Sequence, residues 1–313
     1  MKPVTKLQIR LGHRWDFEAL PAGSIALDGA VAGPRLDPSS GRYSFDHHEG
    51  CLRLITTATC RQVLDALLLG LDPSGFTAYL NDLDADTVLA SWLLEHWERW
   101  KRPAERAKVG PLVSAVAGLD AHGPAYPLEA YELATEFHLR VMAPVREAAR
   151  AEYPAGPHEA LALAWAELES WWQAGLMPSN VKPPTKLELP PLRHWGPWVF
   201  ASWGNIGGRP TFGASGALYG LGYDQLILHR QSELGHHYTL ARRSDLVPGP
   251  SLGQLYPAFN AQEAASRGRP LAPGETWGGG SSVGGGPRRG SVLEPEQVAE
   301  LLETPSGRLR PGE

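Results

Sequence analysis

In this chain of 313 residues, three short apolar segments are each followed by acidic residues or histidines. This pattern limits the possible folds more than any other feature of the sequence. The segments are 24–27, 43–45 and 76–80, and their length and composition are typical of buried strands. Helices are expected over 63–70, with Thr57 or Thr59 as the N-cap, and over 88–97. Strands that alternate with helices predict a mostly parallel sheet flanked by helices. The sequence therefore predicts an α/β fold.

The chain changes character after this first part. Residues 127–175 carry Ala, Glu, Leu and Trp at helical spacing, which predicts a helical insertion. Prolines interrupt regular structure over 181–194, which we interpret as a linker. We therefore expect an N-terminal domain over 1–180 and a smaller C-terminal α+β domain over 195–313. Its expected elements are strands over 198–201, 225–229 and 237–241 and a final helix over 293–302.

Carboxylates and imidazoles gather where the three N-terminal strands end. In chain order these residues are Asp28, Asp46, His47, His48, Asp82, Asp84 and Asp86. In open parallel sheets, ligands bind beyond the carboxyl ends of the strands, so these side chains are expected to meet at one edge. If the extended conformation continued past the third strand, its three aspartates would point to the same side.

Carboxylate and imidazole groups in this number suit a hard divalent cation such as Mn²⁺ or Mg²⁺. Several carboxylates close together are costly without a cation, and a metal removes that cost. Two such ions about 3.5–4 Å apart can clamp an in-line displacement at phosphorus. The competing interpretation is a solvated loop in which one aspartate caps a helix. Three strand ends with the same chemistry favour the metal site.

Composition narrows the class of partner. The formal net charge is -5 and the pI is about 6.1, which argues against a protein that grips long nucleic acid through phosphates. Two cysteines, Cys51 and Cys60, cannot form a disulfide framework and favour a reducing compartment. The N-terminus has no apolar signal core, and no apolar run approaches the ~20 residues of a membrane helix. We expect a soluble, cytoplasmic protein without membrane partners.

Short motifs resemble those of the DHH phosphoesterase superfamily. Residues 45–50, Phe-Asp-His-His-Glu-Gly, resemble its DHH motif, and residues 82–91 resemble its first motif as an Asp-x-Asp-x-Asp variant that enters a helix. Asp28 and Asp120 stand where the family could place its two other aspartates. Residues 277–290 look like the glycine-rich substrate motif of the accompanying C-terminal domain. The motif order is rearranged, because the Asp-x-Asp segment follows DHH here, and the glycine-rich motif lacks the usual histidine.

The resemblance implies a role for each motif residue. It implies two Mn²⁺ or Mg²⁺ ions bridged by Asp28, with Asp84 on one ion, His47, Asp86 and Asp120 on the other, and Asp82 on the first directly or through water. As catalytic residues it implies His47, His48 and Asp46, with Asp46 orienting the histidines. As substrate-binding residues it implies His48, Gly284, Gly285, Gly286, Arg288 and Arg289. A flexible Gly/Ser linker is the competing interpretation of the glycine-rich segment.

The function expected from these residues is hydrolysis of a phosphodiester, phosphomonoester or phosphoanhydride by a metal-activated water. The substrate would be a small phosphorylated compound or a short oligonucleotide. The rearranged order and the missing histidine leave a second interpretation, a catalytically degenerate protein that binds a nucleotide or metal without turnover. A scaffold without metal is the third. The sequence does not indicate whether the chain is a monomer or an oligomer.

Histidines also occur in two strand-like segments of the C-terminal domain. His229, His236 and His237 are interpreted as polar positions on surface strands, with phosphate binding as the alternative. The Gly-x-Ser-x-Gly pattern at 280–284 is interpreted as a chance match, because no apolar strand precedes it.

Overall fold

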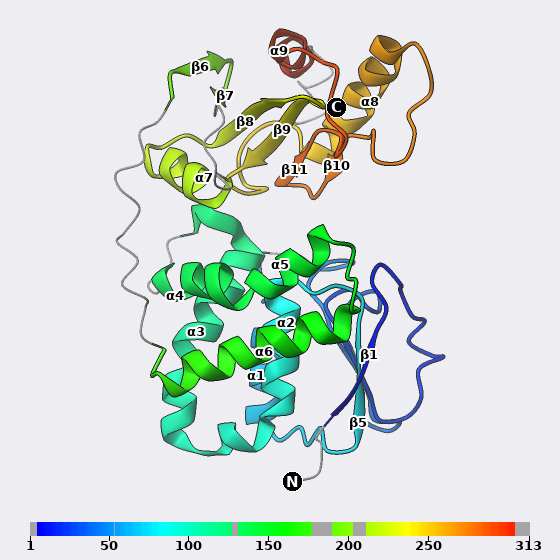
Figure 1. The fold of residues 1–313 in the computed structure, drawn as a ribbon, viewed down its shortest axis with the longest axis vertical. Coiled ribbons are helices and arrows are strands. Elements are labelled where there is room, and N and C mark those ends of the chain that lie inside the picture. Colours follow the sequence, from blue (N-terminus) through cyan, green and yellow to red (C-terminus); the bar gives the residue numbers. More distant parts are fainter. Residues whose placement is uncertain (1–4, 53, 127–130, 177–189, 203–210, 304–313) are drawn as a thin grey trace. The chain divides into compact units, whose positions relative to one another are not determined.

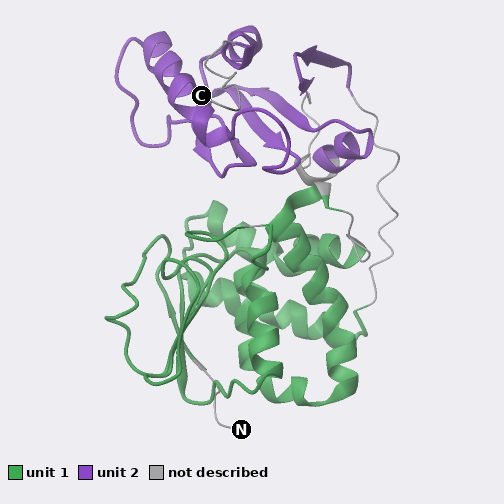
Figure 2. Cartoon of the chain, turned by 180° about the vertical axis from the view of Figure 1, so that it is seen from behind, with its two compact units in different colours: residues 1–181 green, residues 182–313 purple. Residues whose placement is uncertain are grey.

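The computed structural model describes residues 5–52, 54–126, 131–176, 190–202 and 211–303. Contacts divide the chain into two compact units, Met1–Val181 and Lys182–Glu313, shown in different colours in Figure 2. Each unit is described by itself below.

A five-stranded sheet organises the first unit. In spatial order its strands are β1 (Thr5–Ile9), β5 (Phe76–Leu80), β2 (Ser24–Leu27), β4 (Arg42–Phe45) and β3 (Arg35–Asp37). All neighbouring pairs are parallel except β3 with β4. The expected mostly parallel sheet and α/β class are thus confirmed. The sequence interpretation missed the edge strand β1 and also β3, which lies within a stretch of Pro, Gly and Ser.

The helices of this unit lie on one side of the sheet, as Figure 1 shows for α1, α2 and α6 beside β1 and β5. Alternation along the strands explains this. Ile25 and Leu27 pack into the core shared with the helices, whereas Ala26 and Tyr79 pack on the opposite face against Phe17. The opposite face is therefore covered by the segment after β1.

The helical elements of the first unit are α1 (Thr59–Leu68), α2 (Ala85–Glu95), α3 (Pro103–His122), α4 (Tyr131–Glu136), α5 (Ala143–Arg150) and α6 (Pro157–Gln173). Short 3-10 helices span Trp97–Lys101 and Gly123–Ala125, and a π-helix spans Phe137–Val141. The helical segment expected over 127–175 is confirmed from residue 131 onward, while 127–130 lie outside the described residues. No helix in the described ranges is both long and apolar enough to cross a membrane.

The second unit is a mixed sheet with helices. Its strands, in spatial order, are β10 (Gly278–Gly279), β11 (Val283–Gly285), β9 (Gly235–Arg242), β8 (Gln225–Ser232), β7 (Trp198–Ser202) and β6 (Leu192–Trp195). Only β7 and β8 are parallel neighbours. Its helices are α7 (Thr211–Gly220), α8 (Leu252–Arg267) and α9 (Pro295–Glu303).

The expected linker over 181–194 extends too far at its C-terminal end. Strand β6 begins at Leu192 and pairs with β7, so 192–194 is not linker, and the part 181–189 lies outside the described residues. The three expected strands correspond to β7, β8 and β9, and the final helix to α9. These assignments confirm the α+β character of the C-terminal part.

Candidate metal centre

The carboxyl ends of three neighbouring parallel strands meet at one point of the first sheet. Leu27 at the end of β2 is in register with Phe45 of β4 and with Leu80 of β5. Asp28 and Asp46 follow directly, and the acidic segment 82–86 follows β5. The convergence expected from the sequence is therefore present.

His47 lies at the centre of this cluster and is completely buried. Its Nε2 is 2.9 Å from Oδ2 of Asp120, 3.4 Å from Oδ1 of Asp28 and 3.8 Å from Oδ2 of Asp86. None of these contacts has the direction of a hydrogen bond, and both ring nitrogens lack a partner with that geometry. A buried polar atom without a partner is unusual and calls for an explanation.

Asp28 occupies a backbone conformation that non-glycine residues seldom adopt. Its φ is +50°, and it is followed by Gly29 at +77°. Such conformations cost free energy and often occur at functional sites. The buried carboxylate accepts hydrogen bonds from Oγ1 of Thr59, at 3.0 Å, and Oγ1 of Thr87, at 3.2 Å. The first turns of α1 and α2 thus orient Asp28.

Asp86 joins the starts of the same two helices. It lies in the first turn of α2, and its two oxygens accept the backbone N–H groups of Thr59 at 2.7 Å and Cys60 at 2.8 Å. These are orphan donors at the N-terminus of α1. The expected cap by Thr57 or Thr59 was wrong because a carboxylate distant in sequence takes that role and Ala58 is the N-cap residue.

The three aspartates after β5 do not point to one side. Helix α2 begins at Ala85, so the extended conformation ends before Asp86. Asp84 is the N-cap of α2 and accepts the N–H of Thr87 at 2.8 Å. Asp82 is exposed and accepts only the N–H of Leu83 among the described hydrogen bonds. No hydrogen bond or ion pair among the described residues joins Asp82 to the cluster, and the start of α2 at Ala85 corrects the expected alternation.

Asp46 is buried and organises the turn that carries the histidines. Its Oδ1 accepts the backbone N–H groups of His47 and His48, and its Oδ2 accepts that of Gly33. The same Oδ1 lies 3.0 Å from Nδ1 of His48. His48 is part-exposed, with 39% of its side chain accessible, and its Nδ1 lies 3.4 Å from Oδ1 of Asp28. His48 thus connects the buried cluster to the surface.

The charges of the cluster do not balance within the described residues. Among the residues that the structure describes, no lysine or arginine forms an ion pair with the carboxylates around His47. Burial alone would lower the pKa of His47, but Asp120 and Asp28 outweigh it and raise that pKa to about 10. Burial, followed by the charges of Asp120 and Asp28, raises the pKa of Asp86 to about 7.

The pKa of Asp84 shows the same excess of negative charge, whereas that of Asp28 shows the influence of the histidines. Burial and then the charges of Asp28, Asp120 and Asp86 raise the pKa of Asp84 well above its ordinary value. Burial would also raise the pKa of Asp28, but hydrogen bonding and charge from His47 and His48 lower it. One imidazolium cannot neutralise four carboxylates, so the cluster favours a cation.

Two groups of ligand atoms lie within 4.8 Å of one another: Asp28, His47 and His48, and His47, Asp86 and Asp120. The second group contains the three residues that the DHH resemblance assigns to one ion. Buried ring nitrogens without partners and hard oxygen donors fit Mn²⁺ or Mg²⁺, as does a cluster with which no basic side chain of the described residues pairs. A shared imidazole nitrogen binds one ion at a time, so a second ion would depend on the carboxylates.

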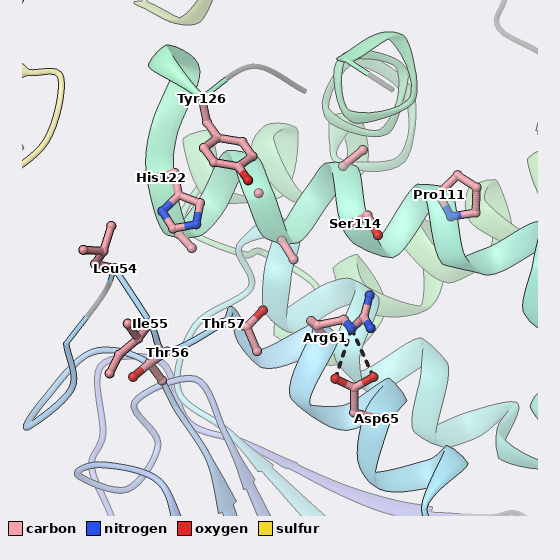
Figure 3. Close-up of a pocket in the computed structure, with 14 residues that line it drawn as sticks. Leu54, Ile55, Thr56, Thr57, Arg61, Asp65, Pro111, Ser114, His122 and Tyr126 are labelled. Atoms are coloured by element: carbon pink, nitrogen blue, oxygen red, sulfur yellow. Dashed lines mark hydrogen bonds and ion pairs between the residues drawn. The ribbon is translucent and has the colours of Figure 1, made fainter. Parts of the chain in front are cut away.

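A cavity of about 670 Å³ is lined by residues of α1, of α3 and of the segment after His48. Ala121, next to Asp120 on α3, is part of its wall, and so is Thr57, two residues before Thr59. Figure 3 shows His122 and Tyr126 above Leu54 and Ile55, and Pro111 and Arg61 on the other side. Sequence reasoning missed this cavity, because its walls come from α1, α3 and the segment after His48 and carry no motif.

The glycine-rich segment of the second unit is ordered by packing. At Gly284 a Cβ would lie 1.8 Å from the Oη of Tyr256, and at Gly285 it would lie 2.3 Å from the backbone oxygen of Tyr238. The flexible-linker interpretation is therefore wrong for this segment, which forms β10 and β11. Arg288 and Arg289 are exposed. The substrate-binding role of Gly284, Gly285, Gly286, Arg288 and Arg289 stays a prediction.

Comparisons with known proteins supply no family. No family model matches the sequence, and a search of curated proteins finds no match. Among solved structures, the chain is similar to an uncharacterized protein from Helicobacter pylori G27, with 11% identity and a TM-score of 0.21, over 90% of this chain and 83% of that one. This similarity assigns neither a family nor an activity.

Proposed function

We propose that this chain is a divalent-metal-dependent phosphoesterase that uses Mn²⁺ or Mg²⁺ at the cluster around His47. One observation carries the proposal: the buried Nε2 of His47 has no hydrogen-bond partner and faces oxygens of Asp28, Asp86 and Asp120. Within the described residues, no basic side chain pairs with these carboxylates. Membership of the DHH phosphoesterase superfamily is part of the same proposal and rests on the motif residues.

In this proposal, His47, Asp86 and Asp120 would hold one ion, and Asp28 and Asp84 would supply carboxylates for a second. When bound, the ions would lower the pKa of water and neutralise charge on phosphoryl oxygens. Thr59 and Thr87 orient Asp28, and Asp46 orients His48 by its Oδ1. His48, the part-exposed member, would contact the phosphoryl group of the substrate.

The cavity lined by residues of α1 and α3 supports a small substrate. Its volume is within the range of sites for small molecules. A small phosphorylated compound or a short oligonucleotide is the substrate class we propose, and the net charge of -5 supports no grip on long nucleic acid. A cytoplasmic location also stays part of this proposal, since it rests on the two free cysteines.

A screen of phosphorylated compounds with added Mn²⁺ tests the function. Phosphate or nucleotide release is measured for phosphomonoesters, dinucleotides and pyrophosphate, with metal content by mass spectrometry. Asp84→Ala and His47→Ala are expected to abolish release, while Asp82→Ala, a matched change in the same segment at an exposed position, keeps it. Metal or nucleotide binding with no release from any compound would favour the degenerate protein instead. No bound metal would contradict both.

A further inference from the structure

Four polar side chains form a continuous chain through the sheet of the second unit, joined by two hydrogen bonds and one ion-pair contact, and the function proposed above makes no use of it. Ser202 Oγ lies 3.1 Å from Nδ1 of His229. Nε2 of His229 lies 2.9 Å from Nδ1 of His236, and Nε2 of His236 lies 3.3 Å from Oε2 of Glu294. The chain leads from an exposed hydroxyl to a largely exposed carboxylate.

The sheet brings these residues together. Ser202, the last residue of β7, is in register with His229 of β8, and His236 is two pairs along the antiparallel ladder between β8 and β9. A backbone bridge between His236 and Ser291 fixes the segment that carries Glu294. The buried carboxylate of Glu263 holds the same segment through Ser291 Oγ and the N–H of Val292. The distances between the four side chains are therefore determined by backbone pairing.

The hydrogen-bond direction along this chain follows from its carboxylate end. A carboxylate oxygen only accepts hydrogen bonds, so the contact with Glu294 favours a hydrogen on Nε2 of His236, whose Nδ1 then accepts. His229 then donates from Nε2 and accepts at Nδ1. Ser202 is left to donate its hydroxyl hydrogen to His229.

Burial separates the base from solvent but leaves the hydroxyl accessible. His229 and His236 are each 7% exposed, and their rings stack at 5.2 Å between Phe200 and Tyr238. Ser202 is exposed. Expecting both histidines on a strand surface was therefore wrong. A serine in contact with a histidine that a further group orients is the arrangement of an activated nucleophile.

We propose that Ser202 is a nucleophile that takes an acyl group from an activated carboxylic ester, with His229 as its general base. The Oγ of Ser202 forms a bond to the carbonyl carbon, and its proton passes to Nδ1 of His229. The ester C–O bond then breaks, and the leaving alkoxide takes that proton. Water releases the acyl group as a carboxylic acid and restores the serine. His236 and Glu294 are positioning residues.

A neutral His229 is consistent with this role. Burial, followed by the charges of His236 and Arg193, lowers the pKa of His229 to about 4. The ring of His229 is therefore unprotonated at neutral pH, as a general base must be before it takes a proton.

A fluorophosphonate probe on the full chain tests the proposal independently of any metal. In this reaction the Oγ–P bond forms, the P–F bond breaks and fluoride leaves. We expect one adduct per chain, mapped to Ser202 by peptide mass spectrometry and unchanged by EDTA. Ser202→Ala should abolish it, and His229→Gln should slow it by about 100-fold or more. Ser232→Ala is the matched control, because Ser232 contacts His237, with which no described carboxylate pairs.

His229 is buried, so slow labelling of His229→Gln could also result from misfolding. A second variant, at the exposed Glu294, separates the two causes. Glu294 is 64% exposed, so Glu294→Gln should keep the thermal midpoint while labelling slows, and Glu294→Asp should restore part of the rate. No adduct at Ser202, or a rate that His229→Gln and Glu294→Gln leave unchanged, would overturn the proposal and leave the chain of residues a structural one. Either result is separate from the phosphoesterase proposal, which fails if no phosphorylated compound is hydrolysed or no metal is bound.

Discussion

The Nε2 of His47 lies 2.9 Å from Oδ2 of Asp120, although one residue follows strand β4 and the other lies in the last turn of helix α3. This contact closes the cluster from the side opposite the sheet. Without it, His47 would face only the carboxylates of the strand ends and of α2. The contact therefore joins α3 to the proposed metal site.

Manganese should stabilise the protein, and Asp120→Asn should remove most of that effect. A ligand at 100 times its Kd stabilises the folded state by about 2.7 kcal/mol. The Asn side chain keeps the size of Asp but loses the charge that attracts the ion. The thermal midpoint with and without Mn²⁺ measures the effect, with Asp82→Asn as the control at an exposed position. An equal Mn²⁺-dependent shift in both variants would contradict the assignment of Asp120.

Metal affinity should rise with pH between about 6 and 8. In the metal-free protein the pKa of His47 is raised to about 10 and that of Asp86 to about 7, so both sites hold protons that a cation must displace. Proton loss at higher pH therefore removes a competitor. Titration calorimetry in buffers of different ionisation enthalpy counts the protons released. Affinity that is constant or falls over this interval would be inconsistent with His47 as a ligand.

Asp86→Ala should destabilise the metal-free protein more than Asp86→Asn. The carboxylate accepts two backbone N–H groups at the start of α1, and leaving a buried donor without a partner costs about 1–3 kcal/mol. Asn keeps one acceptor, whereas Ala keeps none. Urea unfolding in EDTA gives both free energies of unfolding. Equal values for the two variants would show that Asp86 does not cap α1.

Gly285→Ala should destabilise the second unit regardless of any substrate. Its Cβ would lie 2.3 Å from the backbone oxygen of Tyr238, which cannot move without disturbing β9. Overpacking of this kind costs about 1–3 kcal/mol. At Gly284 the obstacle is the Oη of Tyr256, so Tyr256→Phe should partly rescue Gly284→Ala. Unfolding followed by tryptophan fluorescence measures both. A fully stable Gly285→Ala would disprove the packing role.

The sequence predicted the sheet edge because strand ends and their acids are close together along the chain. The segment 24–28 contains both the buried strand and the aspartate that follows it, and so does 43–46. Strands β1 and β3 were missed, because an edge strand with Lys and Gln and a strand of three residues have no clear apolar pattern.

What the sequence could not show depends on contacts between distant elements. The capping of α1 by Asp86 joins two helices and replaces the threonine cap that local sequence suggested. The different directions of the three aspartates after β5 depend on where α2 begins. Asp120 entered only through the family resemblance, since an aspartate inside a helix carries no local signal of metal binding. The burial of His229 and His236 likewise depends on neighbouring strands.

Anomalous diffraction from crystals grown with Mn²⁺ tests the central claim most directly. The account predicts an anomalous peak about 2.0–2.3 Å from Nε2 of His47 and from oxygens of Asp86 and Asp120. A crystal with Mn²⁺ in the solvent but no peak there, and with His47 hydrogen-bonded to Asp120 alone, would contradict it.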